Sequence, residues 1–137
     1  MRFYDSNVLL HAFSKTADEF PKRDIARALL EGGDWCISAQ VLQEFYANAL
    51  RVRAGRLALM GAQEAAQIVE RLQPKVATAT DGPLVREATR ISQRYVVSYW
   101  DAAIIAAAQR AGAGELLSED LNAGQVFEGV TVVNPFA

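Results

Sequence analysis

Hydrophobic positions along this chain follow two alternating patterns. Short apolar runs typical of buried strands are separated by longer stretches in which apolar residues recur every three or four positions, as on one face of a helix. The short runs predict strands at residues 2–4, 35–37, 76–79, 115–118 and 130–133. The longer stretches predict helices at residues 18–30, 39–53, 61–72, 82–95 and 99–110.

Capping and breaking residues support these bounds. Ser38 and Ser98 stand where helix N-caps are expected, while Gly32-Gly33 and Pro74 end two of the helices. Short strands separated by helices imply parallel pairing through right-handed crossovers. The predicted fold is therefore α/β: a three-layer α/β/α sandwich around a central, mostly parallel sheet of four or five strands.

Length and composition indicate one globular domain over residues 1–137. The chain has 137 residues, of which 51% are hydrophobic and 22% charged, with no repeat or linker to divide it. The single cysteine, Cys36, lies in an apolar run and is expected to be a buried thiol. No apolar stretch reaches the length of a membrane span, and Asp5 interrupts the first apolar run, so no signal peptide is predicted. We expect a cytoplasmic protein without a membrane partner.

Charge alone does not identify a nucleic-acid-binding protein. The formal net charge is −2, whereas such proteins commonly carry a basic excess. An enzyme that holds nucleic acid locally and through a metal ion is still compatible with this value. Two arginine clusters could bind phosphates, or could be ordinary solvated faces. They are Arg86, Arg90 and Arg94 at helical spacing, and Arg51, Arg53 and Arg56.

Four carboxylates are the candidate functional residues. Asp5 follows the first predicted strand and Asp120 follows the strand at 115–118, so both should stand at the same edge of the sheet. Asp101 lies in the first turn of the helix at 99–110, and Glu44 lies in the second turn of the helix after the second strand. Ligands of open parallel sheets bind beyond the carboxyl ends of the strands, and all four side chains can reach that region.

Each carboxylate also has a purely structural explanation. Asp5 could cap a turn, Glu44 could belong to a solvated polar stripe, and Asp120 lies in a polar loop. Asp101 stands three residues after Ser98, the spacing of a capping box. Residues 102–108, however, contain no polar side chain, so this helix should be buried. A carboxylate at the entrance of so apolar a helix favours a functional role.

Four segments of the chain resemble, in order, the motifs of PIN-domain ribonucleases. These are Phe3-Tyr4-Asp5-Ser6-Asn7, the stretch from Ser38 to Phe45, the stretch from Tyr99 to Ala108, and Leu116-Leu117-Ser118-Glu119-Asp120. Their order and spacing agree with the family from Arg2 to Val133, and the compact length resembles VapC-type toxins of toxin–antitoxin pairs. Glu119 adds an acid where the family varies, so it could share or replace the role of Asp120.

The resemblance implies a PIN-like fold and a Mg²⁺- or Mn²⁺-dependent endoribonuclease. In that interpretation Asp5, Glu44, Asp101 and Asp120 are both the catalytic and the metal-ligating residues, and Ser118 or Asn7 orients a ligand or a water. A set of oxygen ligands without His or Cys suits Mg²⁺ or Mn²⁺ better than Zn²⁺. The resemblance also implies an RNA substrate, a cognate antitoxin and a homodimer. The one histidine, His11, is interpreted as structural.

Two alternatives keep the fold and change the function. Phosphoryl-transfer domains also place acids and Mg²⁺ at strand ends. A receiver domain, however, needs a lysine after its last strand, and none follows Lys75. Phosphatases of the haloacid-dehalogenase type need Asp-x-Asp after the first strand, where this chain has Asp5-Ser6-Asn7. A non-catalytic interaction module is the other alternative, and the presence of all four acids argues against it.

Overall fold

A six-stranded sheet forms the centre of the computed structural model, which describes residues 1–137. The strands lie in the order β3-β2-β1-β4-β6-β5, and every neighbouring pair is parallel except β5–β6. Their bounds are β1 Arg2–Tyr4, β2 Trp35–Ser38, β3 Val76–Thr78, β4 Glu115–Leu117, β5 Val126–Phe127 and β6 Val130–Val133. The predicted mostly parallel sheet is confirmed.

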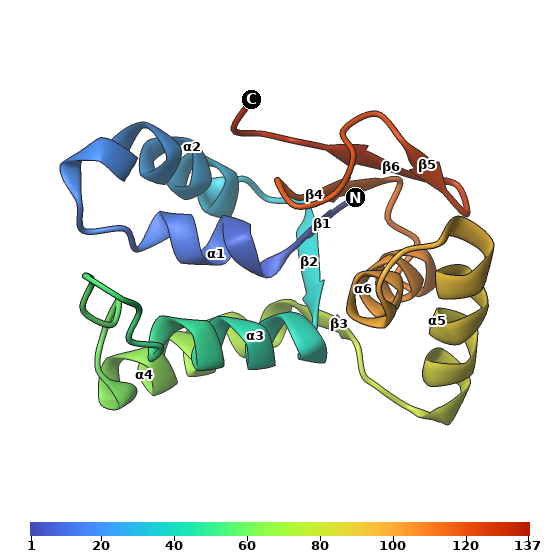
Figure 1. Cartoon of the computed structure of the whole chain (residues 1–137), viewed down its shortest axis with the longest axis horizontal. Helices are drawn as coiled ribbons and strands as arrows, with labels where there is room; N and C mark the ends of the chain where they lie inside the picture. The colour runs from blue at the N-terminus through green and yellow to red at the C-terminus, as the bar shows by residue number, and fades with distance from the viewer.

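Helices cover both faces of the sheet, which confirms the three-layer arrangement. Figure 1 shows α1 to α4 on one side of the sheet and α5 with α6 on the other. Their bounds are α1 Ser6–Ala12, α2 Phe20–Glu31, α3 Ala39–Ala49, α4 Ala62–Leu72, α5 Gly82–Tyr95 and α6 Tyr99–Arg110. Two short 3₁₀ turns, Ala17–Glu19 and Gln73–Lys75, precede α2 and β3.

Two predictions from the sequence were wrong in detail, and one helix was not predicted at all. The sheet has six strands rather than four or five, because β5 is only two residues long and pairs with β6 through a tight turn at Glu128 and Gly129, both at positive φ. The helix predicted over 39–53 ends at Ala49, and the chain then forms a turn around Gly55. Helix α1 was not predicted as an element, since seven residues give too short a periodic signal.

Helix α6 contains the longest run of consecutive buried residues among the helices. All residues from Ala102 to Ala108 are buried, and the helix packs against α5 and against β2, β3, β4 and β6. The buried thiol predicted for Cys36 is also confirmed. No helix in the structure combines the length and the hydrophobicity that crossing a bilayer would require.

The direction of chain progression across the sheet reverses between β1 and β4. The chain runs outward from β1 through β2 to β3 and later returns to β4 on the opposite side of β1. The register places Tyr4 beside Leu117, and the backbone N–H of Asp5 donates to the carbonyl of Leu117 at 3.0 Å. Asp5 and Ser118 are therefore neighbours at the switch point, where open α/β sheets bind their ligands.

Candidate active site

Asp5 is the most buried of the four candidate carboxylates. It caps α1, with Oδ1 accepting the N–H of Ser6 at 2.7 Å and Oδ2 accepting the hydroxyl of Ser118 at 2.8 Å. The residue is only 6% exposed. Burial is the main reason why the pKa of Asp5 is raised to about 6, and the nearby carboxylates of Glu44 and Asp120 raise it further against these two hydrogen bonds.

The side-chain amide of Asn7 joins Asp5 to Asp120. Its Nδ2 lies 3.1 Å from Asp120 Oδ2, 3.2 Å from Ser118 Oγ and 3.5 Å from Asp5 Oδ2. Ser118 Oγ also accepts the backbone N–H of Asp120 at 3.1 Å, which fixes the loop after β4. Asn7 Oδ1 is buried without a hydrogen-bond partner. An unpaired buried oxygen is unfavourable, so it marks a position where a further donor or cation would be stabilising.

Glu44 enters the same cluster from α3. Ser6 donates its hydroxyl to Glu44 Oε1 at 3.2 Å, and Gln40 donates its amide to Glu44 Oε2 at 3.1 Å. The same amide nitrogen of Gln40 lies 3.2 Å from the carbonyl oxygen of Trp100 at the start of α6. This role of Gln40 was not predicted, although its position one helical turn before Glu44 was the available signal.

Asp101 lies at the border of the cluster. Its backbone N–H donates to Ser98 Oγ at 3.1 Å, but its carboxylate makes no hydrogen bond or ion pair. Only half of the capping box is therefore formed, and the carboxylate is left free. The Gln40–Trp100 contact ties the residue next to Asp101 to Glu44. The structure thus brings Asp5, Glu44 and Asp120 together, and it places Asp101 nearby without a contact to them.

Glu119 points away from its neighbour Asp120. Its carboxylate lies 2.7 Å from His11 Nε2 and 3.0 Å from Lys22 Nζ. Burial alone would raise the pKa of Glu119, but the hydrogen bonds from His11 and Lys22 outweigh burial and lower it. Glu119 fastens the loop after β4 to α1 and α2, and Asp120 alone faces the cluster. His11 has the structural place expected of it.

The donor chemistry of the cluster fits a hard divalent cation. Every candidate ligand is a carboxylate or amide oxygen, and the unpaired Asn7 Oδ1 adds one more. No three Asp, Glu, His or Cys side chains are close enough to hold a metal ion in the present rotamers. Instead, hydroxyl and amide donors from Ser118, Ser6 and Asn7 stabilise the carboxylates. A metal ion would require some of these side chains to turn toward one another.

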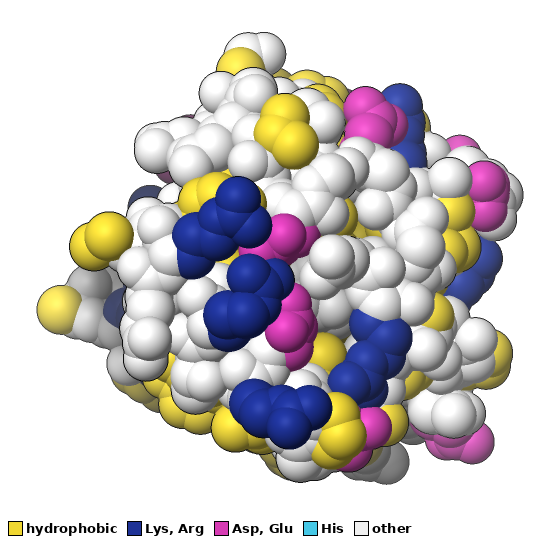
Figure 2. All heavy atoms as spheres, turned by 90° about the vertical axis from the view of Figure 1, so that its right-hand side faces the viewer, with side chains coloured by type: hydrophobic (Ala, Val, Ile, Leu, Met, Phe, Trp, Pro, Cys, Tyr) yellow, Lys and Arg dark blue, Asp and Glu magenta, His cyan; other side chains and the backbone are white.

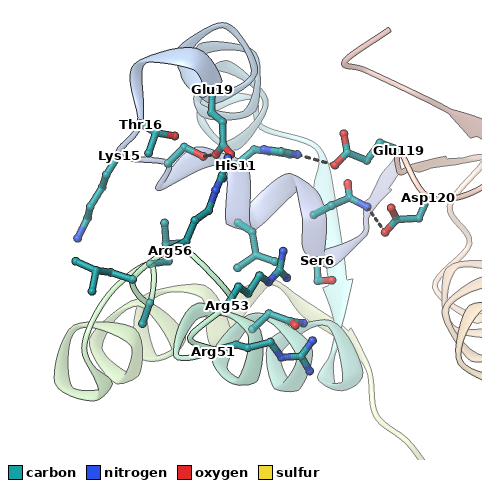
Figure 3. Close-up of a pocket in the computed structure, with 18 residues that line it drawn as sticks. Ser6, His11, Lys15, Thr16, Glu19, Arg51, Arg53, Arg56, Glu119 and Asp120 are labelled. Carbon is teal, nitrogen blue, oxygen red and sulfur yellow. Dashed lines mark hydrogen bonds and ion pairs between the residues drawn. The ribbon is translucent and has the colours of Figure 1, made fainter.

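A groove of about 730 Å³ runs from this cluster along α1, and Figure 3 shows the side chains that line it. At one end, called here the acidic end, lie Ser6, Asn7 and Asp120. On the side of the segment that follows α3, called the basic end, lie Arg51, Arg53 and Arg56. The groove therefore joins the carboxylate cluster to one of the two arginine clusters singled out in the sequence.

The other arginine cluster is largely neutralised. Arg90 lies 2.6 Å from both Glu87 and Glu128, and Arg94 lies 3.2 Å from Glu128. Figure 2 looks onto the side of the molecule that carries α5, and there basic side chains lie among acidic ones. Of the two interpretations left open by the sequence, a solvated and internally paired face is the one that these contacts support.

Comparisons with known proteins place the chain in a family. The PIN domain family matches residues 2–126. Comparison with curated protein sequences gave no match. Among solved structures, a toxin–antitoxin complex from Klebsiella pneumoniae is similar at a TM-score of 0.69, with 20% identity over 98% of each chain.

Two further structures have the same fold. FitAcB from Neisseria gonorrhoeae has a TM-score of 0.64 and 17% identity over 99% of each chain. The toxin VapC20 of Mycobacterium tuberculosis, described as cleaving the sarcin–ricin loop, has a TM-score of 0.62 and 23% identity, over 85% of this chain and 87% of its own. At these identities the structural similarity shows the fold.

Proposed function

The chain belongs to the PIN domain family, and from that membership we propose that it is a metal-dependent endoribonuclease acting as the toxin of a toxin–antitoxin pair. The observation that carries the proposal is the buried Asp5 at the sheet's switch point, with Glu44 and Asp120 close enough to raise its pKa. Such a concentration of like charge is unfavourable for folding, and function is the usual reason that it persists.

Asp5, Glu44, Asp101 and Asp120 would hold Mg²⁺ or Mn²⁺. The bound metal would lower the pKa of a water and stabilise charge on the phosphate. The chain's own residues prepare the site. Ser118 and the backbone of Ser6 orient the Asp5 carboxylate through hydrogen bonds of 2.8 and 2.7 Å.

Asp120 and Glu44 are oriented in the same manner. Asn7 holds Asp120, and Gln40 holds Glu44 while also fixing the start of α6, which carries Asp101. Each proposed ligand other than Asp101 thus already has a neighbouring side chain that sets its direction, as proposed metal ligands require.

The structural neighbours support a protein partner and an RNA substrate. Two of them are described as a toxin–antitoxin complex and as FitAcB, and a third as a toxin that cleaves the sarcin–ricin loop. We therefore propose a cognate antitoxin for this chain. A homodimer and a cytoplasmic location remain predictions from the family resemblance.

Cleavage of RNA by the purified protein tests the proposal. Total RNA incubated with the protein should be cut with Mg²⁺ or Mn²⁺ and left intact with excess EDTA, and mapping the new ends would identify the RNA and the sequence. Asp5→Asn protein, purified identically, controls for contaminating nucleases. Cutting that continues undiminished in EDTA would rule out the proposed metal chemistry. RNA left intact with either metal would favour a phosphoryl-transfer domain or a non-catalytic module.

A further inference from the structure

We propose that Arg51 and Arg53 bind the phosphate backbone of the RNA on one side of the cleavage site, at the basic end of the groove. This inference rests on the proposed function and names the part of the site that holds the substrate. Both arginines line the groove that begins at Ser6, Asn7 and Asp120. In Figure 3 both side chains extend from the segment after α3 toward the side of the groove where Ser6 lies.

The charges that line the groove show which cations are free to bind a ligand. Arg56 is paired with Glu19 at 2.8 Å, and Lys15 lies 3.8 Å from Glu64. Arg51 and Arg53 have neither an ion pair nor a side-chain hydrogen bond, and both are exposed.

Two of the three acids that line the groove are already paired with cations. Glu19 is held by Arg56 and by the hydroxyl of Ser14, and Glu119 is held by His11 and Lys22. The third, Asp120, accepts the Asn7 amide at 3.1 Å and makes no ion pair with Arg51 or Arg53. Their two charges can serve a ligand without first breaking a contact within the protein.

The segment that carries these arginines is held at several points. Arg53 and Arg56 face each other across a tight turn, with the N–H of Arg56 donating to the carbonyl of Arg53 at 2.9 Å and Gly55 at a φ of 75°. The Arg56–Glu19 ion pair fastens this turn to the 3₁₀ turn before α2. The N–H of Met60 donates to the carbonyl of Ala49 at 3.3 Å, which closes the loop at the end of α3. Arg56 is therefore an anchor, and Arg51 and Arg53 are the residues available to a ligand.

The opposite charges of the two ends favour RNA as the occupant. An acidic peptide suits the basic end but is repelled by the carboxylates, and a basic peptide has the opposite difficulty. A single RNA strand suits both ends. The divalent metal that the carboxylates would hold would offset their charge toward a nearby phosphate, while the next phosphates would face the arginines. The planar guanidinium group also matches phosphate oxygens through paired hydrogen bonds.

The test compares two double variants that remove equal charge. Arg51→Gln with Arg53→Gln is the test variant. Arg71→Gln with Arg86→Gln is the control, because those two arginines are likewise exposed and unpaired but lie outside the groove. Binding of an unstructured oligouridylate in EDTA is followed by fluorescence anisotropy from low to high salt, and KM and kcat for its cleavage are measured with Mg²⁺. Thermal melts confirm that each variant is folded.

We expect the test variant to bind RNA about tenfold more weakly. The slope of log K against log salt should fall by about 1.4, because each of two lost phosphate contacts on a single strand contributes about 0.7. KM should rise with kcat nearly unchanged, because a backbone contact holds substrate and transition state alike. The control should leave the slope and KM near those of the parent. The charge-conserving variant, Arg51→Lys with Arg53→Lys, should keep the slope of the parent.

Two results would overturn the inference. In the first, the test variant has the same salt slope and the same KM as the control variant. Because the parent still cleaves RNA in that case, the proposed function stands and only the inference fails. In the second, an oligoglutamate peptide of the same charge as the RNA binds the parent more tightly than the RNA does, and the test variant loses this binding. The basic end would then be a protein-docking site. If the parent binds RNA through Arg51 and Arg53 but does not cut it, the proposed function fails and only the phosphate contact of the two arginines stands.

Discussion

The two ends of the groove are built in opposite ways. At the acidic end, Asn7 and Asp120 join the buried Asp5 and Ser118 in one network in which nearly every polar atom has a partner. At the basic end, Arg51 and Arg53 have no partner among the side chains. Buried carboxylates need hydrogen bonds to be tolerated at all, whereas exposed guanidinium groups are solvated by water. We therefore expect the rate of RNA cleavage to depend on the rigid network at the acidic end. The affinity for RNA should depend on the unpaired side chains at the basic end.

Asp5→Asn should have the largest effect and should fall on the acidic end alone. The change keeps the size of the side chain and its ability to cap α1, but it removes a proposed metal ligand. We expect cleavage to fall by about 10³-fold, since stabilisation by the metal contributes several kcal/mol to the transition state. RNA binding in EDTA should be unchanged or tighter. The rate of RNA cleavage and oligouridylate anisotropy measure the two effects separately, and a variant that retains half of the parent rate would exclude Asp5 as a ligand.

The stability of the metal-free protein should depend on pH through the same residue. The pKa of Asp5 is raised mainly by burial, from 3.8 to about 6, so the folded state binds a proton more tightly than the unfolded state. The contribution of Asp5 to stability should then fall as pH rises from about 4 to 6, by roughly 3 kcal/mol in total. Asp5→Asn should remove most of this dependence and be the more stable protein at pH 7. Urea unfolding at several pH values checks this, and parallel curves for parent and variant would contradict it.

Glu119→Gln should have an intermediate effect, because Glu119 positions the loop that carries Asp120 without joining the cluster. The substitution weakens the contacts to His11 and Lys22, and outer-shell changes of this kind reduce activity by about 10- to 100-fold. We expect kcat to fall more than KM rises. Asp120→Asn provides the comparison and should be more severe. Equal losses in the two variants would mean that Glu119 shares the role of Asp120.

Arg90→Gln with Arg94→Gln should have the smallest effect on RNA. These arginines are held by Glu87 and Glu128, so their charges are compensated and are not available to phosphates. We expect KM to change by less than about twofold and the salt slope to stay that of the parent. A loss of slope comparable with that of Arg51→Gln and Arg53→Gln would show that the paired cluster also binds substrate.

Sequence reasoning was most successful where one local rule determines position. The rule that ligands gather beyond the ends of parallel strands was enough to place Asp5 and Asp120 at one edge, and the apolar run after Asp101 was enough to predict a buried helix. Sequence reasoning could not tell which of the two arginine clusters is free to bind phosphates. Arg90 and Arg94 are neutralised by Glu128, which is 38 and 34 residues away along the chain, and such pairing depends on tertiary structure. The different directions of Glu119 and Asp120 likewise depend on His11, Lys22 and Asn7, which come from other elements.

Pairing of β1 with β4 has a consequence for synthesis of the protein. Asp5 meets its partner Ser118 across 113 residues of chain, so the two cannot come together until almost all of the polypeptide has left the ribosome. At about 5–20 residues per second, that delay is about 6 to 23 seconds. During this interval the nascent chain has its first strand and the helices that follow, but it lacks the strand that completes the carboxylate cluster. On the proposed function, an unfinished copy would therefore lack the assembled site with which to cut the message from which it is being translated.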